Sequence, residues 1–402
     1  MSDDFPDYWK VAPLEDCMAA IIDYRGKSPE KTTSGIPLVT AKIVKGGRIE
    51  QPNEFIAEDD YDDWMRRGMP KPGDVLMTTE APLGEIAQLD DRKVALAQRL
   101  ITLRGKPNFL DNTYLKFLMQ SEFVQDQLKA RATGTTVLGI RQSELRKVSL
   151  VLPPHSEQRA IASVLGALDN KIELNRRMNE TLEAMARALF QHRFVEATQA
   201  GLPKGWREGA LGEVAANPRR GVQPDEMKPA TPYIGLEHMP RRCIALSDWG
   251  LADELESNKF EFKRGEILFG KLRPYFHKVG VAPLDGVCST DILVVTPKEP
   301  AWFGFVLGHV SSAELVNHTN AASTGTKMPR TNWNDLARFE VALPPETLAA
   351  KFSELIQPLI GRIIANIHES RTLAALRDAL LPKLLSGELR MPAAAKLVEA
   401  GA

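Results

Sequence analysis

The sequence predicts an α+β protein of two tandem mixed α/β domains, separated by two long helices that form an antiparallel coiled coil, with pseudo-two-fold symmetry. Three observations predict it: an internal repeat, short strand-like runs within each copy, and a long helical period after each copy. The repeat is far longer than the period of a solenoid, so it indicates two whole domains rather than stacked repeats.

The internal repeat is visible as matched motifs along the chain. Thr133-Gly134-Thr135 recurs as Thr324-Gly325-Thr326, an offset of 191 residues (324 − 133). Gly73-Asp74-Val75-Leu76 matches Gly265-Glu266-Ile267-Leu268 at a slightly larger offset. The offset changes in steps, as loop insertions would make it. Two diverged copies of one module indicate two similar but unequal targets.

Composition sets limits on the function. The 402 residues are 43% hydrophobic and 26% charged, which is typical of a globular protein in which each half can bury a core. The net charge of −1 means that binding to a nucleic acid would depend on local basic patches. We find no membrane-length apolar run and no signal peptide, so we expect a cytoplasmic protein. Cys17, Cys243 and Cys288 form no disulfide or metal pattern.

Each copy contains short apolar runs bounded by Gly or Pro, which is typical of strands. A helical period follows the third run of copy one, at residues 113–129, and a second helical stretch at 301–316 takes its place in copy two. The predicted strands are 36–44, 73–79, 99–104 and 147–154 in copy one, and 231–236, 265–272, 291–297 and 337–345 in copy two.

The segment after each Pro-Pro pair has a helical period. Ser156 is a plausible N-cap of the first helix, and Pro358 should kink the second helix or mark its start. A seam asparagine fixes the register of a coiled coil, and Asn175 and Asn366 occupy equivalent positions. The alternative is that each helix packs only on its own domain. The predicted seam residues are Leu168, Ile172, Asn175, Leu182, Leu189, Leu359, Ile363, Asn366, Leu373 and Leu380.

The connector between the helix and the second domain determines how the helices pair. Residues 196–205 span at most ~35 Å, too short to return along a helix of about 57 Å, so an antiparallel pair is expected. The expected segments are a first domain at 1–154, a first spacer helix at 155–200, a second domain at 201–345, a second spacer helix at 346–390, and a tail at 391–402.

Two motifs resemble enzyme signatures but lack the required chemistry. Residues 265–271 have the spacing of a phosphate-binding loop, yet Leu272 stands where a Ser or Thr must bind Mg²⁺. Residues 224–228 contain nuclease-like fragments, but adjacent residues cannot converge on a metal ion. The histidines show no pairing typical of metal ligands. The sequence therefore predicts no catalytic residue and no metal site.

The chain resembles a known family over nearly its whole length. Residues 152–190, the C-terminal stretch 376–389 and the motifs GDVLMTTEAPLG, ATGTTVLGI and GEILFGKLRPYFHKVG are similar to those of specificity subunits of type I restriction-modification systems. The resemblance implies two target-recognition domains that read a bipartite, asymmetric double-stranded DNA sequence, with the coiled coil as a ruler. It also implies two methyltransferase subunits and restriction (motor-nuclease) subunits as partners. S-adenosylmethionine, ATP and Mg²⁺ would belong to those partners, and no cofactor to this chain.

Base-reading residues cannot be carried over from the resemblance, so DNA contacts are predicted from residue chemistry. Matched loops combine hydroxyls, backbone amides and cations, which suit phosphate oxygens or base edges. The cluster at 271–278 is the densest basic and aromatic stretch. The predicted DNA contacts are Thr78, Thr79, Thr135, Thr136, Arg141, Lys271, Arg273, Tyr275, Lys327 and Arg330.

Two other functions remain as alternatives to a DNA-recognition subunit without chemistry of its own. One is a protein–protein scaffold with duplicated binding ends. The other is a self-sufficient nucleic-acid enzyme, which the failed motifs disfavour.

Overall fold

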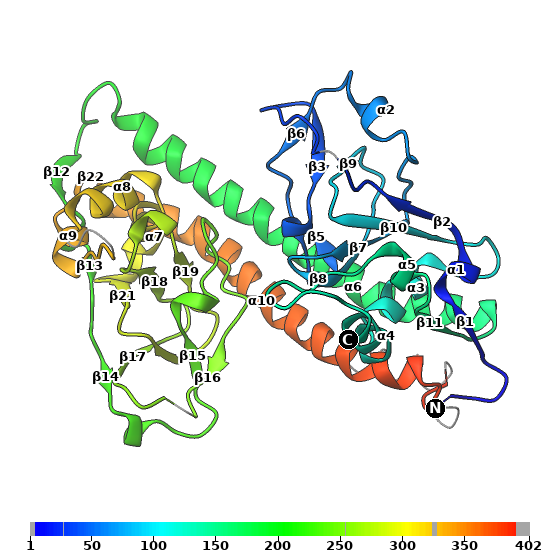
Figure 1. Cartoon of the computed structure of the whole chain (residues 1–402). Helices are drawn as coiled ribbons and strands as arrows, with labels where there is room; N and C mark the ends of the chain where they lie inside the picture. The colour runs from blue at the N-terminus through cyan, green and yellow to red at the C-terminus, as the bar shows by residue number, and fades with distance from the viewer. Residues whose placement is uncertain (1–4, 27, 254, 324–327, 391–402) are drawn as a thin grey trace. The chain divides into compact units, whose positions relative to one another are not determined.

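The computed structural model describes residues 5–26, 28–253, 255–323 and 328–390 (Figure 1). Contacts divide the chain into two compact units. Unit 1 comprises the chain up to Asn170 together with the residues from Leu373 on, and unit 2 comprises Lys171–Thr372. The helices α6 (His155–Phe190) and α10 (Glu346–Leu385) each contribute residues to both units. The limits predicted above for the five segments stay predictions.

The main sheet of unit 1 is antiparallel, in the order β2-β10-β7-β8. Every residue of β7 is buried, because the sheet is covered on both faces: Leu76 packs into an apolar cluster on one side, and helix α3 contacts β7 and β8. The bounds are β2 (Met18–Asp23), β10 (Leu100–Gly105), β7 (Val75–Thr79), β8 (Leu83–Gln88) and α3 (Asn112–Gln120).

Smaller sheets and short helices complete unit 1. In the sheet β6-β3-β9, strand β3 is antiparallel to β6 and parallel to β9. The bounds are β6 (Phe55–Ile56), β3 (Ile36–Val39), β9 (Ala95–Leu96), the pair β1 (Lys10–Pro13) and β11 (Ser149–Leu152), the pair β4 (Val44–Lys45) and β5 (Arg48–Ile49), and α1 (Leu14–Cys17), α2 (Tyr61–Trp64), α4 (Glu122–Ala130) and α5 (Gln142–Leu145).

Unit 2 repeats this topology. Its antiparallel sheet has the order β13-β21-β18-β19, and the pair β12-β22 corresponds to β1-β11. A second sheet, β14-β17-β20-β15-β16, keeps the parallel pairing of β15 with β20 that matches β3 with β9. The bounds are β12 (Arg207–Ala210), β13 (Ala215–Ala216), β14 (Gly221–Val222), β15 (Pro232–Ile234), β16 (Gly250–Leu251), β17 (Lys259–Phe262), β18 (Ile267–Gly270), β19 (Val279–Val281), β20 (Gly286–Cys288), β21 (Ile292–Pro297), β22 (Glu340–Leu343), α7 (Phe303–Val310), α8 (Ala313–Ala322) and α9 (Trp333–Ala337).

The α+β class and the duplication are confirmed, whereas several element limits differ from the prediction. The helix predicted at 113–129 is divided into α3 and α4, because the Ser121 hydroxyl accepts the amide of Val124 at 3.4 Å and caps a new helix. The strand predicted at 36–44 ends at Val39, where a 3-10 turn follows. The first spacer helix ends at Phe190, and a π-helical turn continues to Val195.

The structure corrects two expectations about where the long helices begin. Helix α6 begins at His155, so Ser156 lies in its first turn rather than at the N-cap, and the amide of Gln158 donates to the carbonyl of Pro154 at 3.0 Å. Pro358 does not mark the start of α10, which begins at Glu346. Pro358 is exposed, so its ring faces away from the buried side of the helix.

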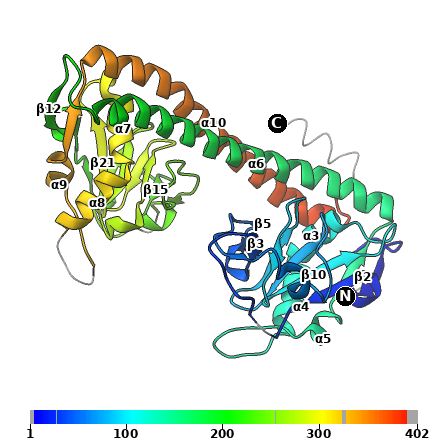
Figure 2. The same cartoon turned by 90° about the horizontal axis from the view of Figure 1, so that it is seen from above.

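In unit 2 the end of α6 and the start of α10 run antiparallel, side by side in both views (Figures 1 and 2). The amide of Asn366 donates to the Asn179 side-chain oxygen at 2.8 Å, and that of Asn175 donates to Glu369 at 2.8 Å and Ser370 at 3.3 Å. Asn175 and Asn366 are both buried, and their side-chain amides donate to different partners. Of the predicted seam residues, Leu168, Asn175, Ile363, Asn366, Leu373 and Leu380 are buried, and Ile172, Leu182, Leu189 and Leu359 are half-buried.

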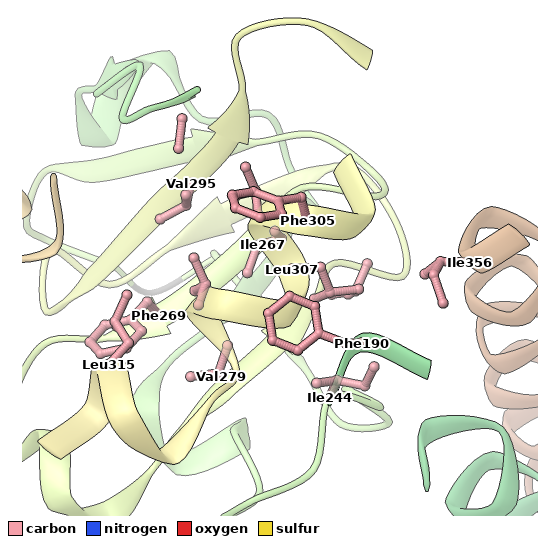
Figure 3. Close-up of a cluster of buried hydrophobic side chains, with 14 of the residues drawn as sticks. Phe190, Ile244, Ile267, Phe269, Val279, Val295, Phe305, Leu307, Leu315 and Ile356 are labelled. Carbon is pink, nitrogen blue, oxygen red and sulfur yellow. The ribbon is translucent and has the colours of Figure 1, made fainter. Parts of the chain in front are cut away.

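Both helices also belong to the core of the second α/β domain. Phe190 of α6 lies among Phe305 and Leu307 of α7, with Ile356 of α10 beside them (Figure 3). A Cβ atom at Gly308 would lie 2.1 Å from the Phe190 ring, so only glycine allows α7 to approach so closely. The two helices therefore pack on each other, as in the predicted coiled coil. They also pack on an α/β domain, as in the alternative of helices that pack on domains.

In unit 1 the N-terminal part of α6 is held to α10 by charge. The Asp169 carboxylate accepts from Arg377 at 2.7 Å and also pairs with Lys116 of α3. Lys116 and Asp169 are largely buried, so this pair of contacts fixes α3, α6 and α10 to one another within the unit.

The Asn179–Asn366 pair gives a test of the seam in unit 2. Replacing Asn366 with Leu leaves the buried Asn179 oxygen without its donor, and we expect a loss of about 1–3 kcal/mol in unfolding free energy. Replacing both asparagines with Leu removes both polar groups and should recover most of that loss. Calorimetric unfolding measures both variants, with the exposed Asn317→Leu as control. Losses that simply add would show that the two side chains are not coupled.

Candidate nucleic-acid interface

In each unit, a hairpin turn is joined to a following loop by backbone hydrogen bonds. In unit 1 the turn between β7 and β8 covers residues 80–82, and Glu80 forms an antiparallel bridge with Gly139. The amide of Ile140 donates to the carbonyl of Thr79 at 3.0 Å. In unit 2 the equivalent turn between β18 and β19 covers residues 271–278, and Leu272 bridges Arg330 in the same way.

The loop of unit 1, which we call the finger loop, covers Thr133–Gly139. Its ends are closed by two hydrogen bonds, from the amide of Thr133 to Gly139 at 2.8 Å and from that of Gly139 to Thr133 at 2.9 Å. Gly134 has a φ of 112°, and a Cβ atom there would lie 2.2 Å from the Val137 carbonyl oxygen. The finger loop is thus compact, and its shape requires glycine at 134.

The turn of unit 2 is longer and holds its backbone in an unusual conformation. Arg273 and His277 both have a φ of 51°, which is uncommon for side-chain-bearing residues, and they flank a 3-10 turn at Pro274–Phe276. The amide of Arg273 donates to the Pro329 carbonyl at 2.7 Å. Tyr275, at the apex of the turn, is 48% exposed. Two strained residues therefore present one exposed aromatic ring.

His277 and Phe276 anchor this turn to the rest of unit 2. The His277 Nε2 atom lies 2.9 Å from the Ser311 carbonyl oxygen, and burial lowers the pKa of the imidazole. The neutral ring suits this position at neutral pH, with the proton on Nε2 for donation to Ser311. The guanidinium of Arg241 stacks on the Phe276 ring at 4.0 Å. His277 therefore supports the turn rather than serving as a surface cation.

The ion pairs beside the two bridges have their acidic and basic partners in opposite places in the two units. In unit 1, Glu80 of the turn pairs with Arg99 at 2.8 Å. In unit 2, Arg330 of the loop pairs with Asp291, which follows β20 as Arg99 follows β9, at 3.4 Å. Both pairs are largely exposed and contribute little to stability, so they are available to reorganise on binding an anion.

Eight of the ten predicted DNA contacts fall into three groups. Thr135, Thr136 and Arg141 are exposed on or beside the finger loop, and Tyr275 and Arg330 are exposed in unit 2. Lys271 and Arg273 are half-buried in the turn of unit 2. Lys327 lies outside the described residues. The structure thus brings together Thr135, Thr136 and Arg141 in one unit, and Lys271, Arg273, Tyr275 and Arg330 in the other.

Thr78 and Thr79 do not face solvent. They are 0% and 3% exposed. The Thr78 hydroxyl accepts the amide of Glu85 at 2.9 Å, and that of Thr79 donates to the Arg99 carbonyl at 3.3 Å. Because both hydroxyls are used inside unit 1, this conformation offers neither to DNA. The apparent hydroxyl loop is the buried end of β7.

Sequence reasoning missed the apolar residues at these tips. Val137 and Leu138 are 53% and 46% exposed in the finger loop, and Met328 is 50% exposed beside the bridge of unit 2. Their signal in the sequence is an apolar residue three positions after the Gly of each Thr-Gly pair, in a loop where polar residues are usual. Arg241, whose guanidinium covers Phe276, was also missed.

Unit 2 contains a cavity of about 220 Å³ at the side of α6, lined by Glu183, Arg187, Arg242 and His277. Glu183 is almost fully buried, and desolvation raises the pKa of its carboxyl. It accepts from the Ile244 amide at 3.0 Å and from Arg187 at 2.8 Å. The bond from Ile244 ties the domain to α6, where Arg187 also lies, so we assign Glu183 a structural role.

Two negative findings apply to the described residues only. Within them, no group of three or more His, Cys, Asp or Glu side chains is placed to hold a metal ion. No helix among them has the length and apolar character needed to cross a membrane.

Comparisons with known proteins point to one family. The family model for the type I restriction modification DNA specificity domain matches residues 9–184. The chain is 27% identical to the type I restriction enzyme MjaIX specificity subunit of Methanocaldococcus jannaschii, over 96% of this chain and 94% of that one. It is 24% identical to the EcoDI specificity subunit of Escherichia coli, over 71% and 74% of the two chains. A crystal structure of the type I S subunit from M. genitalium has the same fold, with a TM-score of 0.59, 16% identity and coverage of 96% and 97%.

The finger loop can be tested through Gly134. Replacing Gly134 with Ala places a Cβ atom against the Val137 carbonyl at a φ unfavourable for alanine, so the loop must open while the rest of unit 1 stays folded. We expect faster amide hydrogen exchange at Thr133 and Gly139, and weaker DNA binding. Gly201→Ala is the matched control, because Gly201 also has a positive φ but no neighbour within 4 Å. Unchanged exchange in G134A would show that the loop is not held closed as described.

Proposed function

We propose that the chain is a specificity subunit of a type I restriction-modification system, and that its two α/β domains each read one half of a bipartite double-stranded DNA sequence. The observation that carries this proposal is the duplicated pair of turn and loop, joined by the same backbone bridge in each unit but bearing different side chains. Equal frameworks with unequal tips suit a target whose two halves differ in sequence.

The chain is the DNA-reading member of its complex and not the catalytic one. Two methyltransferase subunits and the restriction (motor-nuclease) subunits are its proposed partners. S-adenosylmethionine, ATP and Mg²⁺ would be bound by those subunits. Relatives of this chain come from an archaeon and from bacteria. Because DNA lies in the cytoplasm of such cells, a DNA-reading role favours a cytoplasmic location.

The proposed contacts divide by chemistry. Lys271, Arg273, Arg330 and Arg141 suit phosphate oxygens and guanine edges, whereas the hydroxyls of Thr135 and Thr136 suit either phosphates or bases. Tyr275 offers an exposed ring that can stack on a base or a sugar. The net charge of −1 is compatible with this, because the cations gather at the turn of unit 2.

Replacing residues 1–150 with the corresponding domain of another specificity subunit tests the proposal directly. Each domain has its own core and its own tip, so we expect one half-site to change and the other to remain. Sequencing of methylated sites in cells that express the hybrid with its methyltransferase gives both halves at once. A hybrid that changes both halves would contradict independent reading by the two domains.

The salt dependence of DNA binding tests the phosphate contacts of unit 2. Lys271→Ala should weaken binding equally for all sequences and reduce the slope of log affinity against log salt by about 1. Lys263→Ala is the control, because Lys263 lies before β18 and Lys271 after it, at opposite ends of the same strand. An unchanged slope for K271A would remove Lys271 from the interface.

A further inference from the structure

We propose that Val137 and Leu138 in the finger loop of unit 1 form an apolar contact that reads the 5-methyl group of a thymine in the major groove. The inference rests on the proposed function and adds a base-specific contact that polar residues of the tip cannot make. In the major groove, the thymine methyl is the one apolar group that distinguishes a base pair.

The exposure of these two side chains is unusual for their position. Val137 is 53% exposed and Leu138 46% exposed, and they are adjacent in the returning half of a loop whose other residues are Thr and Gly. The loop between α4 and α5 extends away from the body of unit 1 (Figure 2). Adjacent apolar side chains exposed on a loop add little to the stability of the fold, and contiguous exposed apolar surface often marks a binding site.

The loop presents these side chains in a fixed geometry. Its closure by Thr133 and Gly139, and the contact of Gly134 with the Val137 carbonyl, hold the tip without help from the Val137 and Leu138 side chains. A preformed tip loses less conformational entropy on binding than a mobile one. The two apolar groups can therefore be changed without changing the loop.

Cations surround the base of the finger loop. Arg141 is exposed two residues after it, and Arg25, which pairs with Asp23 at 2.8 Å, donates to the Ile140 carbonyl at 3.4 Å. Arg99 lies on the other side of the bridge, paired with Glu80. Apolar side chains between basic ones match the major groove, in which the edges of the base pairs lie between two phosphate backbones.

The same feature is present in the second unit. Met328 is 50% exposed, and it lies two residues before Arg330, as Val137 lies two residues before Gly139. Gly139 and Arg330 form equivalent bridges to the hairpin turns, so Val137 and Met328 occupy equivalent positions. An exposed apolar side chain at this point in both units indicates a shared use rather than chance exposure.

The size of the patch favours a base over a protein partner. A stable protein–protein interface buries about 800 Å² on each partner, far more than two side chains supply. One methyl group against two aliphatic side chains is a contact of matching size.

The experiment compares thymine with uracil, which lacks only the methyl group. The complex of this chain with its methyltransferase subunits is titrated with duplexes that carry its target, each with one thymine replaced by uracil. We expect about a 4-fold loss of affinity at one thymine of the half-site read by unit 1, which is the effect of one buried methyl group. In V137A/L138A this thymine-to-uracil ratio should fall to about 1, while ratios at other positions remain.

Val11→Ala is the matched control, because Val11 is 61% exposed on β1 of the same unit and lies outside the finger loop. It should leave every ratio unchanged. Melting curves of both variants should match that of the unmodified chain, because the side chains removed are exposed.

Three outcomes would overturn the methyl contact. The first is sequence-specific binding that is insensitive to uracil throughout that half-site, and the second is a half-site without any A·T pair. The third is loss of methyltransferase binding by V137A/L138A, which would make the patch a protein-docking surface. Absence of sequence-specific binding by the unmodified complex would instead refute the proposed function itself.

Discussion

The backbone bridge between hairpin turn and loop is the constraint on which each candidate interface depends. Glu80 with Gly139, and Leu272 with Arg330, are joined through main-chain groups. Main-chain hydrogen bonds do not depend on side-chain identity, so the framework survives changes in the residues that it presents. This explains how the turn and loop of unit 1 carry Glu80, Val137 and Leu138, while those of unit 2 carry Arg273, Tyr275 and Arg330. The backbone framework of turn and loop is the same in both units, and the side chains that it carries can diverge.

The sheets hold this framework of turn and loop rigid. Strand β7 ends in two threonines whose hydroxyls bond within unit 1, and the turn of unit 1 begins at the next residue. In unit 2, β18 leads directly into the longer turn, whose Phe276 and His277 are anchored by Arg241 and Ser311. Each turn therefore starts from a strand that is buried along its length, and movement is limited to the tip.

The repeat, the α+β class and the two long helices could be predicted from the sequence, because periodicity and matched motifs extend over many residues. The break at Ser121 could not, since one hydroxyl decides it within a continuous apolar period. The burial of Thr78 and Thr79 was missed for a related reason. A threonine at a strand end looks like a loop hydroxyl until its hydrogen-bond partners, which are distant in sequence, are known.

The two ends of the described chain belong to the same unit, and this affects the order in which the protein can fold during synthesis. Gly387 packs against Pro6 and Trp9, and Arg377 binds Asp169, so unit 1 needs residues that are synthesised after all of unit 2. Unit 2 is a continuous stretch and has all its residues earlier. The N-terminal domain therefore emerges first but completes its packing last, the reverse of the usual order for tandem domains.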